Sequence, residues 1–302
     1  MTGRRVGHRV EPTKQVASDL LSGQITRSAG GEVLLPSNSR PRRRRGPVVV
    51  DISERDRAVL TAVDQHGVLT AGQLERVLFA GRHASTVATR RRCQAVLRRL
   101  VDAELLDRMD RRVGGHRAGS SGFIYRLTTR GHRVLGDSIR GGRWEPSERH
   151  LLHLLATAEV SVQLAAAARQ GDAASLSVTH EPQTWRRFVG PHQSVETLKP
   201  DLLVEIQTRA WELRWFVEVD RATEHLPTVV KKCVQYQRYW QSGQEDHPVF
   251  PRVLWSVPDE RRATAIEGAI EGTRSLEADL FRVATSDQTL AVLLGKPSNE
   301  DT

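Results

Sequence analysis

Apolar residues recur at the spacing of amphipathic helices in the first half of the chain. The segments with this spacing cover residues 52–66, 70–79 and 85–103. Ser53 and Thr70 stand at the starts of the first two segments, where a hydroxyl can cap a helix. Short apolar stretches at residues 105–109 and 123–127 predict a hairpin. Three helices followed by a hairpin predict a winged helix-turn-helix, which a fourth helix from Thr128 would close.

The second half of the chain predicts an α/β domain, because helical and strand-like segments alternate there. Helices are predicted at residues 146–169, 227–241 and 260–274. Strands are predicted at residues 176–180, after Pro200, up to Asp220, and at residues 252–257 and 280–285. The stretch between His180 and Pro200 is predicted to be a loop. We therefore expect a central mixed sheet in an α/β domain, within a chain that is α+β overall.

The charge of the chain is unevenly distributed. The net charge is +9 at pH 7, and the isoelectric point is about 10.3. Residues 1–140 hold 27 Lys and Arg against 13 Asp and Glu, whereas residues 141–302 hold 18 against 23. A basic surplus favours a polyanionic partner such as DNA. Because the surplus lies wholly in the first half, we expect that half to contact the partner.

Two features of the sequence bear on the cellular compartment. Cys93 and Cys233 both fall on predicted helices, which fits a reducing compartment better than a disulfide framework. No uninterrupted apolar run approaches the roughly 18 residues of a membrane span, and the N-terminus lacks the apolar core of a signal peptide. We expect a cytoplasmic protein with no membrane partner.

The N-terminal segment predicts a disordered basic arm. Residues 1–48 are rich in Arg, Ser, Gly and Pro and show no sustained periodicity. Positive charge is concentrated near the end of this segment, in Arg42, Arg43, Arg44 and Arg45. Such a run can tether DNA, because neutralising backbone phosphates releases counterions. The alternative is a solvated linker.

The third predicted helix is the candidate DNA reader. Its N-terminal half carries Thr86, Thr89, Arg90, Arg91, Arg92 and Gln94, whereas core residues fill its C-terminal half. This polarity suits a helix whose leading end enters the major groove. On the predicted wing, Arg111, Arg112 and Arg117 would reach a phosphate or the minor groove. In the alternative, the winged helix contacts protein and its arginines form a solvated face.

Acidic residues among apolar neighbours mark the second domain. Asp201 stands at the start of one predicted strand, and Glu218 and Asp220 end the next. Strand alternation puts Glu218 and Asp220 on one face, so both could point toward a pocket beneath Asp201. Three convergent carboxylates would bind Mg²⁺ or Mn²⁺. In the alternative, a salt bridge to Lys232 or Arg221 neutralises the acids without catalysis.

The order of helices and strands resembles the common core of the PD-(D/E)xK nuclease superfamily. Together with the winged helix, the segments 199–201 and 216–224, and Lys232 with Tyr236, resemble the replication-relaxation family of actinobacterial plasmids and other mobile elements. The resemblance covers residues 51 to about 294. The expected divisions are a disordered arm at 1–48, a winged helix at 49–140, a nuclease-like domain at 146–295 and a disordered tail at 296–302.

The resemblance implies a nuclease-like site with Asp201, Glu218, Asp220 and Lys232 as catalytic residues. In the superfamily the third motif reads acid, any residue, lysine on one strand, and here Asp220 stands where that lysine would be. Some members supply the lysine from the following helix, where Lys232 is placed. Glu159 matches an acid that some branches place on the first helix. The expected metal ligands are therefore Asp201, Glu218, Asp220 and Glu159.

Two histidines stand near the start of the first helix of the second domain. His150 and His153 are three residues apart, a spacing that can indicate a metal site. No cysteine or further histidine lies nearby at a compatible spacing. We therefore expect both histidines to be at the surface or partly packed.

These observations favour a DNA-binding protein of a plasmid or mobile element that acts in replication, DNA relaxation or transfer, as a Mg²⁺-dependent endonuclease that nicks DNA. The alternative is a non-catalytic regulator or replication accessory, whose inactive nuclease-like domain is a docking surface. The replacement of the strand lysine by Asp220 favours this alternative. The expected partners are double-stranded DNA and replication or transfer proteins. The sequence leaves a homodimer as an alternative to a monomer, since winged-helix proteins often read paired half-sites.

Overall fold

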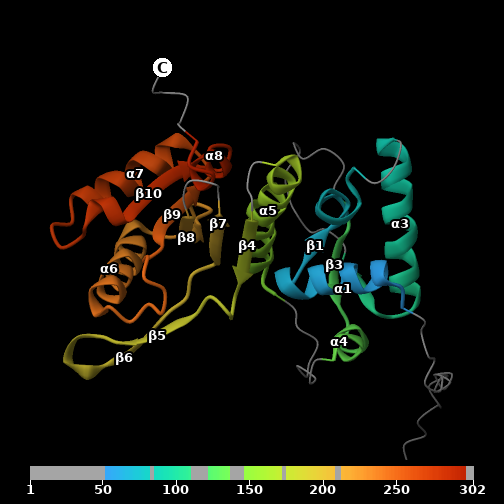
Figure 1. Ribbon diagram of the computed structural model, residues 1–302, viewed down its shortest axis with the longest axis horizontal. Coiled ribbons are helices and arrows are strands. Elements are labelled where there is room, and N and C mark those ends of the chain that lie inside the picture. The colour runs from blue at the N-terminus through green and yellow to red at the C-terminus, as the bar shows by residue number, and fades with distance from the viewer. Residues whose placement is uncertain are drawn as a thin grey trace, which may run out of the picture. The chain divides into compact units, whose positions relative to one another are not determined.

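The computed structural model describes residues 52–81, 85–109, 122–136, 146–171, 175–207 and 212–296 (Figure 1). All of them belong to one compact unit that covers residues 50–302. Several predicted features lie outside the described residues. These are the arm with Arg42, Arg43, Arg44 and Arg45, the wing with Arg111, Arg112 and Arg117, and the tail beyond Lys296.

The first part of the described chain is built on helices and a small sheet. Its elements are α1 (Glu54–His66), β1 (Leu69–Thr70), α2 (Ala71–Leu74), the π-helical turn η1 (Glu75–Phe79), α3 (Thr86–Asp102), β2 (Leu106–Met109), β3 (Ile124–Leu127) and α4 (Thr129–Leu135). Ser53 and Thr70 cap α1 and α2 by accepting backbone N–H groups, as predicted. The three strands pair antiparallel in the order β1-β3-β2.

The second part is organised by a mixed five-stranded sheet, as the sequence predicted. Its strands are β4 (Ser175–His180), β7 (Leu202–Gln207), β8 (Glu212–Val219), β9 (Arg252–Val257) and β10 (Phe281–Thr285). They lie in the order β10-β9-β8-β7-β4. The β8–β9 and β9–β10 pairs are parallel, and the pairs β4–β7 and β7–β8 are antiparallel. The chain is thus a mixed α/β protein.

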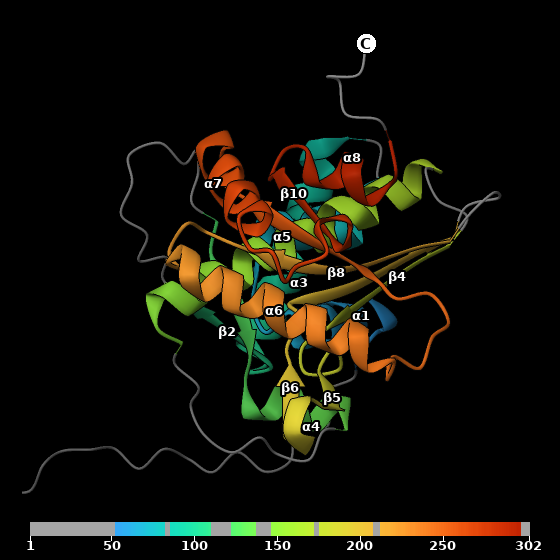
Figure 2. The same cartoon turned by 90° about the vertical axis from the view of Figure 1, so that its left-hand side faces the viewer.

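Helices cover both faces of this sheet. On one face lie α6 (Leu226–Ser242) and α7 (Glu260–Glu271), which contribute Tyr236 and Ile266 to a core with Phe216 (Figure 2). On the other face lie α5 (Glu148–Gln170) and the short helix α8 (Thr289–Leu293). The central strands are therefore buried on both sides, which explains the apolar runs in β7, β8 and β9.

Helix α5 lies between the two parts (Figure 1). Val160 and Leu164 pack on the five-stranded sheet, whereas Leu151 and Ala158 pack against residues of the first part. Within the described residues, α5 is long and apolar enough to cross a membrane by length and composition alone. Because the apolar residues of α5 pack against both parts, α5 is a core helix of this fold.

The segment predicted to be a loop between β4 and β7 instead contains a two-stranded ribbon. Its strands are β5 (Arg186–Val189) and β6 (Val195–Leu198), joined by the 3₁₀ turn η2 (Pro191–Gln193). Phe188 and Leu198 turn inward and are 2% and 0% exposed. The strands are only four residues long and carry several polar residues, so the apolar pattern was too short to predict them. A further 3₁₀ turn, η3 (Ala278–Leu280), precedes β10.

Candidate functional site

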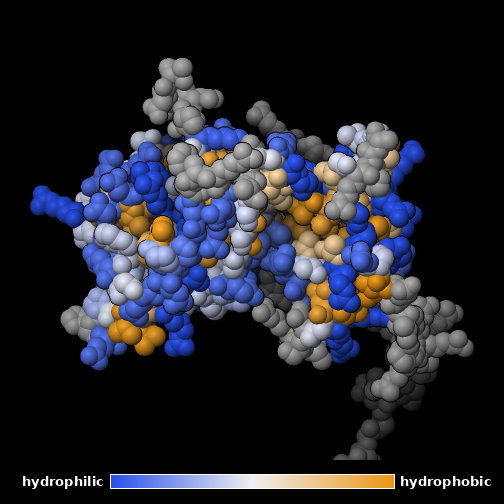
Figure 3. Space-filling view, in the orientation of Figure 1, coloured by the Kyte–Doolittle hydropathy of each residue, from blue (hydrophilic) through white to orange (hydrophobic). Residues whose placement is uncertain are grey.

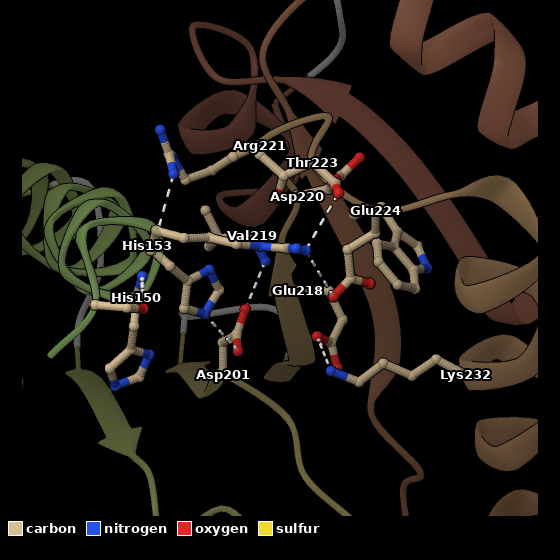
Figure 4. Close-up of a pocket in the computed structure, with 13 residues that line it drawn as sticks. His150, His153, Asp201, Glu218, Val219, Asp220, Arg221, Thr223, Glu224 and Lys232 are labelled. Atoms are coloured by element: carbon tan, nitrogen blue, oxygen red, sulfur yellow. Dashed lines mark hydrogen bonds and ion pairs between the residues drawn. The ribbon is translucent and has the colours of Figure 1, made fainter. Parts of the chain in front are cut away.

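A cavity of about 270 Å³ lies where α5, β8 and α6 meet (Figure 4). Antiparallel pairing places the start of β7 beside the end of β8, since Leu202 pairs with Val217. Asp201, just before β7, therefore lies close to Glu218 and Asp220 at the end of β8. The lining includes Asp201, Glu218, Asp220 and Lys232, together with His150, His153, Arg149, Arg221, Thr223 and Glu224. The structure thus brings the four predicted catalytic residues to one cavity.

Asp201 is held by two hydrogen bonds and is 9% exposed. Its Oδ2 accepts the backbone N–H of Val219 at 2.7 Å, and its Oδ1 lies 3.1 Å from Nε2 of His153. Burial alone would raise the pKa of Asp201, but the hydrogen bond from His153 and the charge of Lys232 outweigh it and lower the pKa. Asp201 is therefore an ionised carboxylate at neutral pH.

Glu218 lies beside Asp201 and is 2% exposed. One of its carboxylate oxygens pairs with Nζ of Lys232, and the other accepts the hydroxyl of Tyr236. Burial raises the pKa of Glu218 to about 8, against the opposing effect of Lys232. Burial would lower the pKa of Lys232, but the charges of Glu218 and Asp201 raise it. Lys232 is therefore the helix-borne cation that the sequence predicted, and it lies against the acid of β8.

Asp220 is bound differently from its two acidic neighbours. Its Oδ2 pairs with Nε of Arg262 on α7, and its Oδ1 accepts the backbone N–H of Ala222 at 2.9 Å. The Arg262 side chain also donates to the carbonyl of Glu224 at 2.8 Å. Asp220 thus lines the cavity but acts there as the partner of an arginine that the sequence did not identify.

Glu159 lies away from the cavity. Its two carboxylate oxygens each accept a hydrogen bond of 2.6 Å from the guanidinium group of Arg76 on η1. Gln73 on α2 donates to the same carboxylate at 3.3 Å and to the carbonyl of Leu155 at 3.0 Å. Arg76 and Gln73 together lower the pKa of Glu159 against the effect of burial. The structure places Glu159 in the contact between α5 and the first part of the described chain.

Both α5 histidines line the cavity, and they are at the surface or partly packed as expected, since His150 is exposed and His153 is partly buried. The hydrogen bond to Asp201 raises the pKa of His153, against the effect of burial. His150 also lines the cavity. The signal that could have found them is their spacing, since residues three apart lie on one helix face. The partner on that face, Asp201, is 48 residues away in the sequence.

Positive side chains surround the mouth of the cavity. Arg149 donates to the carbonyl of Thr223 at 3.2 Å and lies 3.8 Å from a carboxylate oxygen of Glu224. Arg221 donates to the carbonyl of Arg149 at 3.5 Å. These two arginines and Lys232 come from three different segments and line the same cavity. Arg221 and Lys232 are labelled in Figure 4. An anionic group such as a phosphate would meet converging cations there.

The predicted reading helix, α3, presents most of its polar residues to solvent. Its exposed members are Thr86, Arg90, Arg91, Arg92 and Gln94. Arg90 lies 3.5 Å from a carboxylate oxygen of Glu75 and remains 69% exposed. Thr89 is buried, at 7% exposure, and donates its hydroxyl to the carbonyl of Ser85 at 3.0 Å. Thr89 therefore supports the start of α3 from within, while the arginines are open to a partner.

A metal site was expected from four acids, and the structure separates that set. Among the described residues, no group of three or more His, Cys, Asp and Glu side chains is arranged to hold a metal ion. Asp201 and Glu218 remain side by side at the cavity, whereas Asp220 is paired with Arg262 and Glu159 with Arg76. Two carboxylates next to a bound phosphate fit the ligand preference of Mg²⁺. Of the four expected ligands, Asp201 and Glu218 are therefore the two that stay together at the cavity.

The comparisons with known proteins give one match. No curated protein and no solved structure matches the chain. Residues 60–253 match the replication-relaxation family. These residues include the whole of α3 as well as Asp201, Glu218 and Lys232. The matched segment is more than half of the 302-residue chain. The chain therefore belongs to the replication-relaxation family.

Proposed function

We propose that this protein binds the DNA of a plasmid or other mobile element and nicks it during replication, relaxation or transfer. Membership of the replication-relaxation family supports the process. The observation that carries the chemistry is the convergence of Asp201, Glu218 and Lys232 at one cavity with arginines at its mouth. Acids that hold a hard cation, next to a cation of the chain itself, are what phosphodiester hydrolysis requires.

The DNA grip is assigned to the first part of the described chain. The helices α1, α2 with η1, and α3, followed by the β2–β3 pair, follow the order of a winged helix-turn-helix. Arg91 and Arg92 on the leading half of α3 are exposed and line a shallow groove with Val87. Duplex DNA would contact this face through phosphates and base edges.

In the cavity, Asp201 and Glu218 would hold Mg²⁺ or Mn²⁺. The ion, when bound, supplies positive charge beside the scissile phosphate. The ammonium group of Lys232 remains charged and offsets the negative charge that develops on the phosphate oxygens. His153 fixes Asp201 in place through its hydrogen bond. In the hydrolysis, a water oxygen bonds to phosphorus while the bond from phosphorus to one sugar oxygen breaks, and that sugar oxygen takes up a proton.

The test is nicking of supercoiled plasmid DNA by the purified protein in the presence of Mg²⁺ or Mn²⁺. We expect Asp201→Asn to lower the nicking rate about 100-fold or more, because it removes a charge at the reacting centre. The matched control is Glu159→Gln, an acid-to-amide change on α5 outside the cavity, which should retain the rate. Absence of nicking by the unaltered protein, or an unchanged rate in Asp201→Asn, would contradict the proposal.

A second candidate function rests on the partners within the chain that already occupy the same carboxylates. All four carboxylate oxygens of Asp201 and Glu218 have a hydrogen-bond or ion-pair partner within the chain. A cluster that is already neutralised can serve as a rigid docking surface of a DNA-binding regulator or replication accessory. DNA binding that is identical with and without a chelator, combined with no cleavage, would favour this candidate.

A further inference from the structure

The β5–β6 ribbon has one face in the core and one face in solvent. Phe188 points inward, and its ring centroid lies 5.1 Å from that of Tyr239 on α6. Because side chains alternate along a strand, the intervening residues form an outer face. This outer face consists of Trp185, Arg187, Val189, Val195, Thr197 and Lys199. In both cartoon views the ribbon projects beyond α6 (Figures 1 and 2).

The outer face exposes large apolar side chains. Trp185 is 42% exposed, and Val189 and Val195, which are cross-strand partners, are 49% and 63% exposed. The space-filling view shows apolar surface over this ribbon (Figure 3). The two valines point away from the core, so core packing does not account for them. Exposed apolar side chains grouped in this way mark interaction sites.

The charge of the outer face identifies the kind of partner. Nζ of Lys199 lies 4.2 Å from the centroid of the Trp185 ring, and Arg187 is also exposed. The six residues of the outer face include no acid. Glu181 accepts the indole N–H of Trp185 at 2.8 Å and so is already paired at the edge of the face. An aromatic ring between two cations complements a chain of bases and phosphates.

The ribbon is fixed to the body before any partner binds. The side-chain amide of Gln244 bonds both the N–H and the carbonyl of Val189, at 3.0 and 3.1 Å. Gln235 on α6 donates to the carbonyl of Thr197 at 3.1 Å. These bonds come from two segments outside the ribbon and hold both strands. A surface held in this way loses little conformational entropy on binding.

The base of the ribbon leads directly into the cavity. The hydroxyl of Thr184 donates to the carbonyl of Pro200 at 2.6 Å, which ties the two ends of the ribbon together. Lys199 precedes Asp201 by two residues, so their Cα atoms are at most about 7 Å apart. The aromatic and cationic end of the outer face is therefore the end next to the acids of the cavity.

We propose that the outer face of the β5–β6 ribbon binds an unpaired stretch of DNA and leads that strand to the cavity. A base stacks on the indole of Trp185, and Arg187 and Lys199 contact the adjoining phosphates. The proposal rests on the proposed function, and it adds unpaired DNA as the form of substrate at this site. Unpaired DNA is favoured over duplex because an aromatic ring can stack only on a base whose face is exposed.

The proposal is tested by measuring the affinity of the full-length protein for a fluorescent oligonucleotide without secondary structure, and for a duplex of the same length. Trp185→Ala should weaken binding of the single strand about tenfold and leave duplex binding unchanged. Trp185→Phe, which keeps an aromatic ring, should restore most of the loss. The matched control is Trp240→Ala, which removes another exposed tryptophan, 41% exposed, on α6. This control should bind the single strand as the unaltered protein does.

Equal single-strand affinity for Trp185→Ala and the unaltered protein would overturn the proposal, as would an equal loss in Trp240→Ala. A change in oligomeric state by sedimentation in Val195→Lys, with single-strand affinity unchanged, would also overturn it and assign the face to a second copy of the chain. Failure of the hydrolysis proposal is distinguishable. In that case neither the unaltered protein nor any variant nicks DNA, yet Trp185→Ala still binds the single strand more weakly than the unaltered protein does.

Discussion

Helix α5 carries charged groups to two contacts that differ in kind. At its start, His153 bonds to Asp201 beside a cavity that also holds Glu218 and Lys232. At its middle, Glu159 binds Arg76 across a contact with η1, where the two side chains are 36% and 48% exposed and do not line that cavity. We call these the pocket contact and the middle contact. The difference teaches that the same residue types form a site only where the chain leaves space for a ligand.

The two contacts also differ in how much free energy is lost when one charge partner is removed. In the pocket contact the acids are almost fully removed from water, so loss of a partner leaves a buried charge. In the middle contact, water reaches both partners of the ion pair, so the same loss is screened. Substitutions at the two contacts should therefore differ in their effect on the free energy of unfolding.

The largest effect is expected from Arg262→Met. The Arg262 and Asp220 side chains are 13% and 2% exposed, and removal of the arginine leaves Asp220 buried without its charge partner. We expect the free energy of unfolding to fall by about 3–5 kcal/mol, measured by urea denaturation. A loss below about 1 kcal/mol would show that the acids of the cavity are as well hydrated as those of the middle contact.

A smaller effect is expected from the pH dependence of His180, which packs against α5 outside both contacts. Ser161 on α5 bonds to His180 at 3.0 Å, and the His180 ring centroid lies 4.3 Å from that of His66. Burial, with a further contribution from His66, lowers the pKa of His180 to about 3. The unfolded chain takes up a proton near pH 6.5 that the folded state does not, so stability falls as the pH drops below about 6.5. At pH 5 the loss from this residue is about 2 kcal/mol.

The measurement is urea denaturation between pH 7.5 and 4.5 of the unaltered protein and His180→Gln. Gln has no proton to gain in this range, so the variant should lose less stability on acidification. Parallel pH profiles for the two proteins would show that His180 is not the acid-sensitive group.

Glu159→Gln should have a smaller effect on stability. The amide keeps the shape of the side chain but removes the charge that binds Arg76, and the pair is partly exposed. We expect a loss of under about 1 kcal/mol in the free energy of unfolding, by the same denaturation method. A loss comparable with that of Arg262→Met would remove the distinction between the two contacts.

The pKa of His153, the histidine of the pocket contact, should be shifted in the opposite direction from the pKa of His180. The hydrogen bond to Asp201 raises the pKa of His153. Its contribution to stability is therefore complete below the unfolded value of about 6.5 and is lost as the pH rises through the raised value. The NMR titration midpoint of its ring protons should lie above 6.5 and fall in Asp201→Asn. An unmoved midpoint in that variant would sever the link between His153 and Asp201.

The sequence predicted the element order and four of the residues that line the cavity. Asp201, Glu218 and Asp220 were predictable because each stands at the end of a strand whose apolar pattern is clear, and Lys232 because it lies in the first half of the next helix. The assignment of Glu159 shows what local pattern misses. It lies six positions after His153, which places the two side chains about 120° apart around α5. They therefore face different neighbours, and only the structure shows which face meets the cavity.

Other features were beyond prediction for a physical reason. Arg262 reaches Asp220 from another helix 42 residues away, and no local pattern records such a partner. The same separation concealed the role of His153. The β5–β6 ribbon was missed because alternation over four residues is too short a signal, and its inward side chains gain their burial from α6. Contacts that tertiary packing creates are the part that sequence reasoning left out.

The most direct test of the central claim compares two neighbouring lysines on α6. Lys232 lines the cavity and pairs with Glu218, whereas Lys231 is exposed and does not line it. Lys231→Met and Lys232→Met change the net charge equally, so a nicking assay in Mg²⁺ separates position from charge. We predict that Lys232→Met lowers the nicking rate about 100-fold or more and that Lys231→Met retains it. Equal rates in the two variants would contradict a catalytic cavity built on Asp201, Glu218 and Lys232.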